Sequence, residues 1–156
     1  MSGNGLGWRG LSYATESDIC RAYQIARNHG VPDERIIVFM ADIAANDPHN
    51  RYPGTLYNEE NGPNVYKGVP KDYTGKGNWT IESFLDVLEG KKMNMGSRKT
   101  LETGPKDRIL IYFESHGGVG LSLFGYSFES KYILTASRFN ETINKMHKNQ
   151  RYGKMA

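Results

Sequence analysis

The chain has 156 residues, a formal net charge of +3 at pH 7 and a single cysteine. This length favours one domain. The net charge is mild and the lysines and arginines are scattered, so the sequence indicates no nucleic-acid partner. The single cysteine excludes an internal disulfide and a metal cluster built from cysteines. No apolar run is long enough for a membrane span or a signal-peptide core, so we expect no targeting signal in this chain.

The first third of the chain predicts a helix followed by a strand. Thr15 and Asp18 have the spacing of a capping box, and apolar residues then recur at helical spacing, which predicts a helix over Glu16–His29. Cys20 lies beside this apolar stripe, so we expect a packed side chain rather than a nucleophile. The continuous apolar run Ile36–Met40 predicts a strand in the interior of a sheet.

The middle of the chain predicts a long loop, a helix and a linker. Residues 41–78 are dense in turn signals without periodicity, and we expect this loop to drape over one edge of the sheet. Thr80 then precedes apolar residues at helical spacing and Gly90 follows them, which predicts a helix capped at both ends. Residues 91–107 are polar and predict an exposed linker.

The clearest strand signal lies at residues 109–113, which are uniformly apolar and rich in β-branched and aromatic types. They predict a strand buried on both faces, and therefore an α/β sheet. His116 follows this strand and precedes three glycines, at the edge where open α/β sheets usually place their sites. From this stretch alone, a capping role and a catalytic role for His116 are equally open.

The last part of the chain predicts two short extended pieces and a helix. The pieces are Leu121–Phe124 and Tyr126–Leu134, and Ser137 is the predicted N-cap of the helix. The other histidines have no metal-ligand spacing and we expect them to be exposed, so the sequence implies neither a metal nor an organic cofactor. The predicted apolar face of the helix comprises Phe139, Ile143 and Met146. The other histidines are His29, His49 and His147.

Several of these segments, in this order, resemble the legumains, the asparaginyl endopeptidases. The resemblance extends from about Asp18 to Met155, and its most specific segment is Asn64–Gly75, which distinguishes legumains from the related GPI transamidase subunits. The other segments that carry it are Ala22–Ile25, Gly30–Asp33, Ile111–Phe113 with His116–Gly117, and Asn140–Ile143.

The resemblance implies a caspase-like fold: a three-layer α-β-α sandwich with a mostly parallel sheet, here an incomplete one, with residues 1–156 forming part of a legumain-type peptidase domain. It also implies a Cys-His mechanism in which His116 is the catalytic histidine and the backbone N–H of Gly117 stabilises the oxyanion. The implied partner is a peptide or protein substrate, and the implied location is the lysosome, the vacuole or the secreted fraction.

Departures from the family pattern qualify this expectation. The family's nucleophilic cysteine and first strand have no counterpart here, so we expect the chain to be inactive alone. Where legumains have Asn-Tyr-Arg-His, this chain has Ser12–Thr15, and Ala14 cannot replace an arginine in a substrate pocket. The family's acid pair is reduced to Asp42, and Ser115 stands where legumains commonly have aspartate.

Three functions stay open on the sequence. The favoured one is a legumain-type cysteine endopeptidase represented by an incomplete chain. The second is a non-catalytic homologue that binds a substrate, an inhibitor or an intact protease as a decoy. The third, a GPI transamidase-like subunit, is disfavoured by the legumain-type segment Val69–Tyr73.

Overall fold

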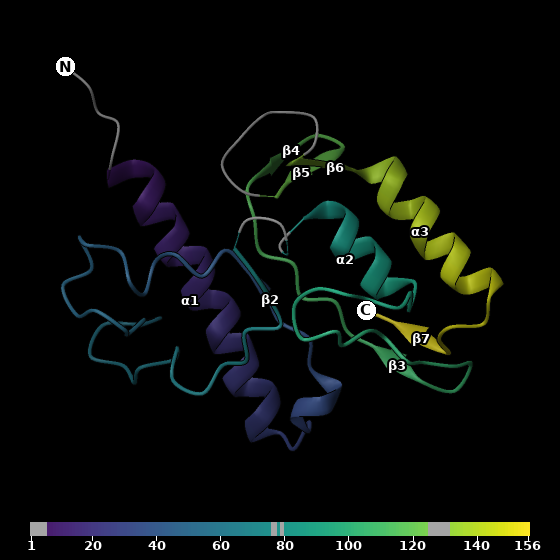
Figure 1. The fold of residues 1–156 in the computed structure, drawn as a ribbon, viewed down its shortest axis with the longest axis horizontal. Helices are drawn as coiled ribbons and strands as arrows, with labels where there is room; N and C mark the ends of the chain where they lie inside the picture. The colour runs from purple at the N-terminus through teal and green to yellow at the C-terminus, as the bar shows by residue number, and fades with distance from the viewer. Residues whose placement is uncertain (1–5, 76–77, 79, 125–131) are drawn as a thin grey trace. The chain divides into compact units, whose positions relative to one another are not determined.

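A computed structural model describes residues 6–75, 78, 80–124 and 132–156, with the side chains of the first helix described from residue 12 onward. The chain forms two compact units, Met1–Lys76 and Gly77–Ala156. Each unit combines helices with short strands, as the ribbon in Figure 1 shows. The sequence-based expectation of an α/β architecture is therefore confirmed.

The first unit is built on helix α1, Leu6–Asn28, which begins well before the predicted start of Glu16–His29. The predicted capping box is wrong, because Thr15 lies inside the helix and its hydroxyl donates to the backbone carbonyl of Ser12 at 3.2 Å. Asp18 also lies inside the helix, where its carboxylate accepts a hydrogen bond from a loop side chain. Serine and threonine hydroxyls can bond backbone groups either at a cap or within a helix, so their spacing did not fix the helix start.

Two strands of the first unit pair in parallel. The short 3-10 helix η1, Asp33–Arg35, precedes β1, Phe39–Met40, and β1 pairs with β2, Tyr73–Thr74. The first residues of the two strands stack their aromatic rings with centroids 4.4 Å apart. The predicted strand Ile36–Met40 is thus confirmed in place but is shorter than expected.

The loop between β1 and β2 packs on α1 and ends at β2, so it is shorter than the predicted loop of residues 41–78. The side-chain amide of Gln24 on α1 donates to the carbonyls of Val65 and Lys67, both at 3.0 Å. Cys20 is fully buried beneath the loop, which confirms its predicted packed role. The buried cluster joins α1, β1 and the loop, and comprises Cys20, Tyr23, Val38, Met40, Ala44, Ala45, Leu56, Val65 and Val69.

The second unit contains helices α2, Ile81–Leu88, and α3, Ala136–Lys148. The predicted cap of α2 is confirmed: the Thr80 hydroxyl accepts from the Ser83 N–H at 3.0 Å, and the Ser83 hydroxyl accepts from the Thr80 N–H at 3.0 Å. Gly90 follows the helix at a φ of 70°, as expected for a residue that ends a helix.

The predicted cap of α3 is wrong by two residues. The N-cap is Thr135, whose hydroxyl accepts from the backbone N–H of Arg138 at 3.2 Å. Ser137 lies within the helix and donates to the carboxylate of Glu141. The predicted inner face of α3 is borne out by Met146, which is almost fully buried.

The predicted strand at residues 109–113 is only partly formed. Strand β3, Arg108–Ile109, pairs in parallel with β7, Lys154–Met155. Ile109 is 6% exposed, whereas Leu110 is 78% exposed and Tyr112 is 55% exposed. The prediction of burial on both faces is therefore wrong, because β7 is the one described strand that pairs with β3 and its ladder covers only two residues.

A three-stranded antiparallel sheet follows β3. Its order is β4, Gly117–Gly118, then β5, Leu121–Leu123, then β6, Ile133–Thr135. Strand β5 confirms one predicted extended piece, and β6 contains the end of the other, whose residues 126–131 lie outside the described part of the chain. The aromatic rings of Phe84, Phe113, Phe124 and Phe139 pack together in this unit.

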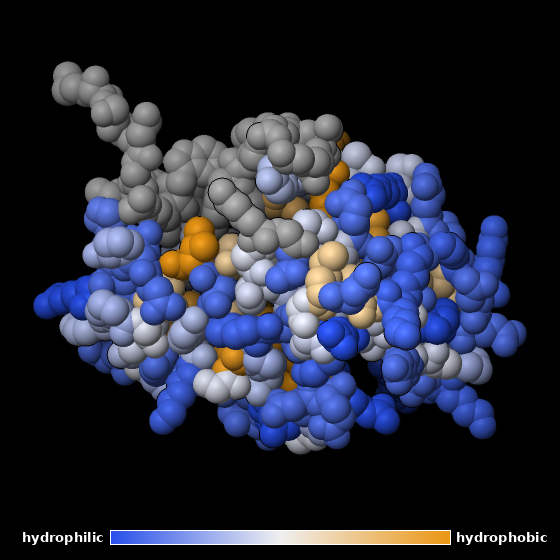
Figure 2. All heavy atoms as spheres, viewed as in Figure 1, coloured by the Kyte–Doolittle hydropathy of each residue, from blue (hydrophilic) through white to orange (hydrophobic). Residues whose placement is uncertain are grey.

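Most of the segment of residues 91–107 is exposed or half-buried, as predicted, with local anchors. Met93 is buried, and the backbone N–H of Leu101 donates to the carbonyl of Val87 on α2 at 3.1 Å. Elsewhere the face drawn in Figure 2 is mostly hydrophilic, with apolar residues in small separate areas. The segment is thus exposed over most of its length and is attached to α2 at Leu101.

Candidate active site

His116 immediately precedes β4 and is held by the backbone of β5. Its carbonyl accepts a hydrogen bond from the N–H of Leu123 at 2.8 Å, and the neighbouring Ser115 hydroxyl donates to the carbonyl of Leu123. The His116 side chain is half-buried, and its Nε2 atom is buried without a hydrogen-bond partner among the described residues. The ring therefore keeps one nitrogen uncommitted to this part of the protein.

Gly117 is required by the packing of the hairpin. A Cβ at this position would lie 2.6 Å from the carbonyl oxygen of Leu121 and 3.3 Å from the Cα of Ser122, so the backbone of β5 excludes any side chain. The close approach of β5 is therefore a reason for glycine at position 117 that lies within the fold itself.

The backbone N–H of Gly117 points away from β5. In an antiparallel ladder, hydrogen-bonded and non-hydrogen-bonded residue pairs alternate. The bond from Leu123 to His116 makes that pair a hydrogen-bonded one, so the next pair, Gly117 with Ser122, is not. Gly117 is also exposed, which leaves its N–H available on the outer edge of the sheet.

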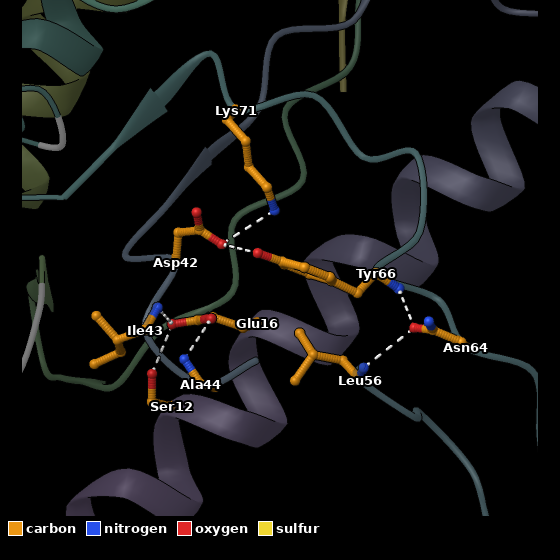
Figure 3. Close-up of polar contacts among 9 residues, drawn as sticks. All are labelled: Ser12, Glu16, Asp42, Ile43, Ala44, Leu56, Asn64, Tyr66 and Lys71. Atoms are coloured by element: carbon orange, nitrogen blue, oxygen red, sulfur yellow. Dashed lines mark hydrogen bonds and ion pairs between the residues drawn. The ribbon is translucent and has the colours of Figure 1, made fainter. Parts of the chain in front are cut away.

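A second polar cluster lies in the first unit around Glu16 (Figure 3). The Glu16 carboxylate is 2% exposed and accepts hydrogen bonds from the Ser12 hydroxyl at 2.8 Å and from the N–H groups of Ile43 and Ala44, both at 3.1 Å. Burial raises the pKa of Glu16, and the three donors partly oppose this effect. The Ser12 hydroxyl is thus committed to Glu16.

Asp42 stands beside this cluster with its backbone in the left-handed region, at a φ of 60°. It accepts hydrogen bonds from the Tyr66 hydroxyl at 2.7 Å and from the Lys71 ammonium at 3.0 Å. The Lys71 Nζ atom also lies 3.5 Å from the centroid of the Tyr66 ring. Figure 3 shows the Lys71 and Tyr66 side chains both directed at Asp42. Sequence reasoning did not find these contacts, because the partners belong to an aperiodic loop.

The predicted site residues fall in both units. His116 and Gly117 are adjacent in the second unit, whereas Ala14 and Asp42 belong to the first. Burial raises the pKa of Cys20 to about 12, so its thiol is protonated at neutral pH and unsuited to nucleophilic attack.

The predicted exposure of His29, His49 and His147 is confirmed. Among the residues that the structure describes, no group of three metal-ligating side chains is assembled. Within the same described ranges, no helix combines the length and the apolar character needed to cross a membrane.

Comparison with known proteins identifies the family. Residues 8–156 match the Peptidase C13 family, and the chain belongs to this family. The family has a caspase-like fold, in agreement with the α/β class and with the resemblance to legumains noted in the sequence.

Curated relatives include legumains and vacuolar-processing enzymes. The chain is 43% identical over 152 residues to legumain of Rattus norvegicus, an alignment that covers 96% of this chain and 33% of the relative. It is 43% identical over 146 residues to the vacuolar-processing enzyme delta-isozyme of Arabidopsis thaliana, covering 92% of this chain and 30% of the relative. The chain thus spans about a third of the length of these relatives.

Proposed function

We propose that this chain is part of a legumain-type cysteine endopeptidase domain in which His116 and Gly117 serve catalysis. The observation that carries the proposal is the local geometry of these two residues in a member of the Peptidase C13 family. The two residues are adjacent in the chain, the imidazole Nε2 has no described partner, and the Gly117 N–H is turned out of its ladder. Acyl transfer requires both of these groups at one place.

The chemistry assigns a separate task to each group. A thiolate attacks the carbonyl of the scissile peptide bond, the His116 imidazole delivers a proton to the departing amine, and the Gly117 N–H stabilises the oxyanion. The thiol comes from outside these residues, because Cys20 is the single cysteine and is fully buried. The chain alone is therefore expected not to hydrolyse peptides.

The relatives support a proposal for the substrate and the location. We take the substrates to be proteins cleaved after asparagine, in a lysosome, a vacuole or the secreted fraction, in keeping with the names legumain and vacuolar-processing enzyme. Discrimination for asparagine is expected to be weak, because Ala14 and Thr15 carry no cationic or imidazole donor for the substrate amide. A site without donors for a polar side chain loses specificity steeply.

The test is a fusion of this chain to the segment that follows the matched region in rat legumain, assayed with an asparaginyl peptide. His116→Ala should lower kcat by about 10²- to 10⁴-fold, the usual contribution of a general acid or base. Cys20→Ala should leave kcat within about twofold of the kcat of the unsubstituted fusion, and so should His147→Ala, the control at an exposed histidine. Full activity in His116→Ala, or a loss of kcat in folded Cys20→Ala, would contradict the assignment.

A further inference from the structure

A cavity of about 640 Å³ opens in the second unit, away from the His116 hairpin in sequence. Its volume lies within the range of pockets that hold small organic molecules, roughly 300 to 1,000 Å³. It is formed by the end of α2, the segment that follows it and one residue after α3. The lining residues are Gly90, Lys92, Met93, Arg98, Thr100, Glu102, Thr103 and Arg151.

The charge of this lining is unbalanced. Lys92, Arg98 and Arg151 contribute three positive charges, and Glu102 contributes one negative charge, which leaves two positive charges in excess. Within the described ranges, none of these four side chains forms an ion pair. Three acidic residues in or directly after α2 are instead paired with Lys91, Arg138 and Lys145, namely Glu82, Asp86 and Glu89.

Arg151 is held firmly at the wall of the cavity. Its guanidinium donates to the carbonyl of Leu101 and occupies the space that a Cβ at residue 90 would need, so Gly90 admits it. Its Nε atom and the Thr103 hydroxyl are buried without a hydrogen-bond partner among the described residues. Both residues line the cavity, and a buried polar group without a hydrogen-bond partner is stabilised when an acceptor reaches it.

Arg98 adds a conformational feature. Its backbone adopts a φ of 65°, a region that non-glycine residues seldom enter, and it lies in the cavity wall. Local backbone strain of this kind is concentrated at ligand-binding positions. Met93 is buried in the same wall and offers an adaptable apolar surface.

We propose that this cavity binds an organic phosphate monoester. Guanidinium groups match the geometry of phosphate oxygens, and a phosphate monoester carries a charge of about −1.5 to −2 at pH 7, which balances the two excess positive charges. The carbon part of the ligand would contact Met93. This activity is distinct from peptide hydrolysis and does not depend on His116.

The experiment is a titration of the isotope-labelled chain with phenyl phosphate, followed by the amide resonances of Gly90 and Thr103. Saturable shifts are expected at these residues, and phenyl sulfate, which carries a single negative charge, should bind several-fold more weakly. Arg98→Gln and Lys92→Gln should each weaken binding about tenfold, the effect of losing one hydrogen bond to a charged group. The matched control Lys148→Gln, an exposed lysine on α3 outside the cavity, should not change the affinity.

A further variant separates binding from misfolding. Glu102→Gln removes the one negative charge of the lining and should tighten phenyl phosphate binding, a gain that loss of structure cannot produce. Shifts that do not saturate, equal binding of inorganic phosphate and phenyl phosphate, equal weakening in Lys148→Gln, or no tightening in Glu102→Gln would each overturn the proposal.

Discussion

The Tyr66 hydroxyl donates a hydrogen bond of 2.7 Å to the carboxylate of Asp42, a residue whose backbone is held at a φ of 60°. This bond links the start of the long loop to its later part. Burial first, and then the hydrogen bond to Asp42, raise the pKa of the Tyr66 phenol. Tyr66 therefore holds the strained backbone of Asp42 in place, although the two residues are far apart in the sequence.

Tyr66→Phe is expected to lower the free energy of unfolding by about 1.5 to 3 kcal/mol, the usual value for a hydrogen bond to a charged group. Chemical denaturation measures this change. Tyr52→Phe is the matched control, since Tyr52 is 53% exposed, and it should change stability by less than about 0.5 kcal/mol. Equal effects of the two substitutions would show that the bond to Asp42 does not hold the loop.

Gly117→Ala should destabilise the second unit by about 1 to 3 kcal/mol, because the methyl group would press on the carbonyl of Leu121. Gly118→Ala is the control, since its Cβ would find its nearest neighbour, a side-chain atom of Leu121, at 4.0 Å. Thermal unfolding of the two variants gives the comparison. If Gly117→Ala were as stable as Gly118→Ala, the close approach of β5 would be refuted.

Glu16 should make stability depend on pH. Its pKa is raised in the folded state above the ordinary value of 4.5, so the folded state holds the proton more tightly than the unfolded chain does. The free energy of unfolding should therefore fall as the pH rises from about 4.5 through the folded-state pKa, and then level off.

Glu16→Gln should remove this fall with pH, although it should also lower stability at every pH by about 1 to 3 kcal/mol, because the amide nitrogen cannot accept from Ala44. Denaturation curves between pH 4 and pH 8 measure both effects. Glu60→Gln, at an exposed position, should keep the pH profile of the parent chain. An unchanged slope in Glu16→Gln would assign the pH dependence to other groups.

Cys20 should resist thiol reagents in the folded chain. A thiol with a pKa of about 12 has about one part in 10⁴ as thiolate at pH 8, and Cys20 is also fully buried. Modification by a disulfide reagent should be slow in buffer and rapid in denaturant. Rapid modification without denaturant would mean that the packing of α1 on the loop opens readily.

The sequence predicted the parts of the fold whose causes are local. Helix α2 was predicted with its caps, because Thr80, Ser83 and Gly90 act within a few residues of the helix. The start of α1 was not, because Ser12 and Glu16 are satisfied inside a helix that receives hydrogen bonds from Ile43 and Ala44 across the unit. Local patterns carry no information about such distant donors.

The same division holds for the candidate sites. His116 and Gly117 stand out in the sequence because they follow an apolar run and resemble a family motif. The placement of Arg151 over Gly90 could not be predicted, because the two residues meet only when the chain after α3 returns to the end of α2. Nor could the exposure of Leu110, which depends on how far the β7 ladder extends.

The two sheets of the second unit impose an order on folding. Strands β4 and β5 close over a two-residue turn, whereas Arg108 in β3 must wait for Lys154 in β7, with three strands and α3 synthesised in between. Closing the larger loop carries the greater entropy cost, so we expect the antiparallel sheet to form first and the parallel ladder last. During translation, Arg108 and Ile109 of β3 remain an unpaired strand edge until β7 emerges, and we expect that interval to be when the nascent chain most needs protection from aggregation.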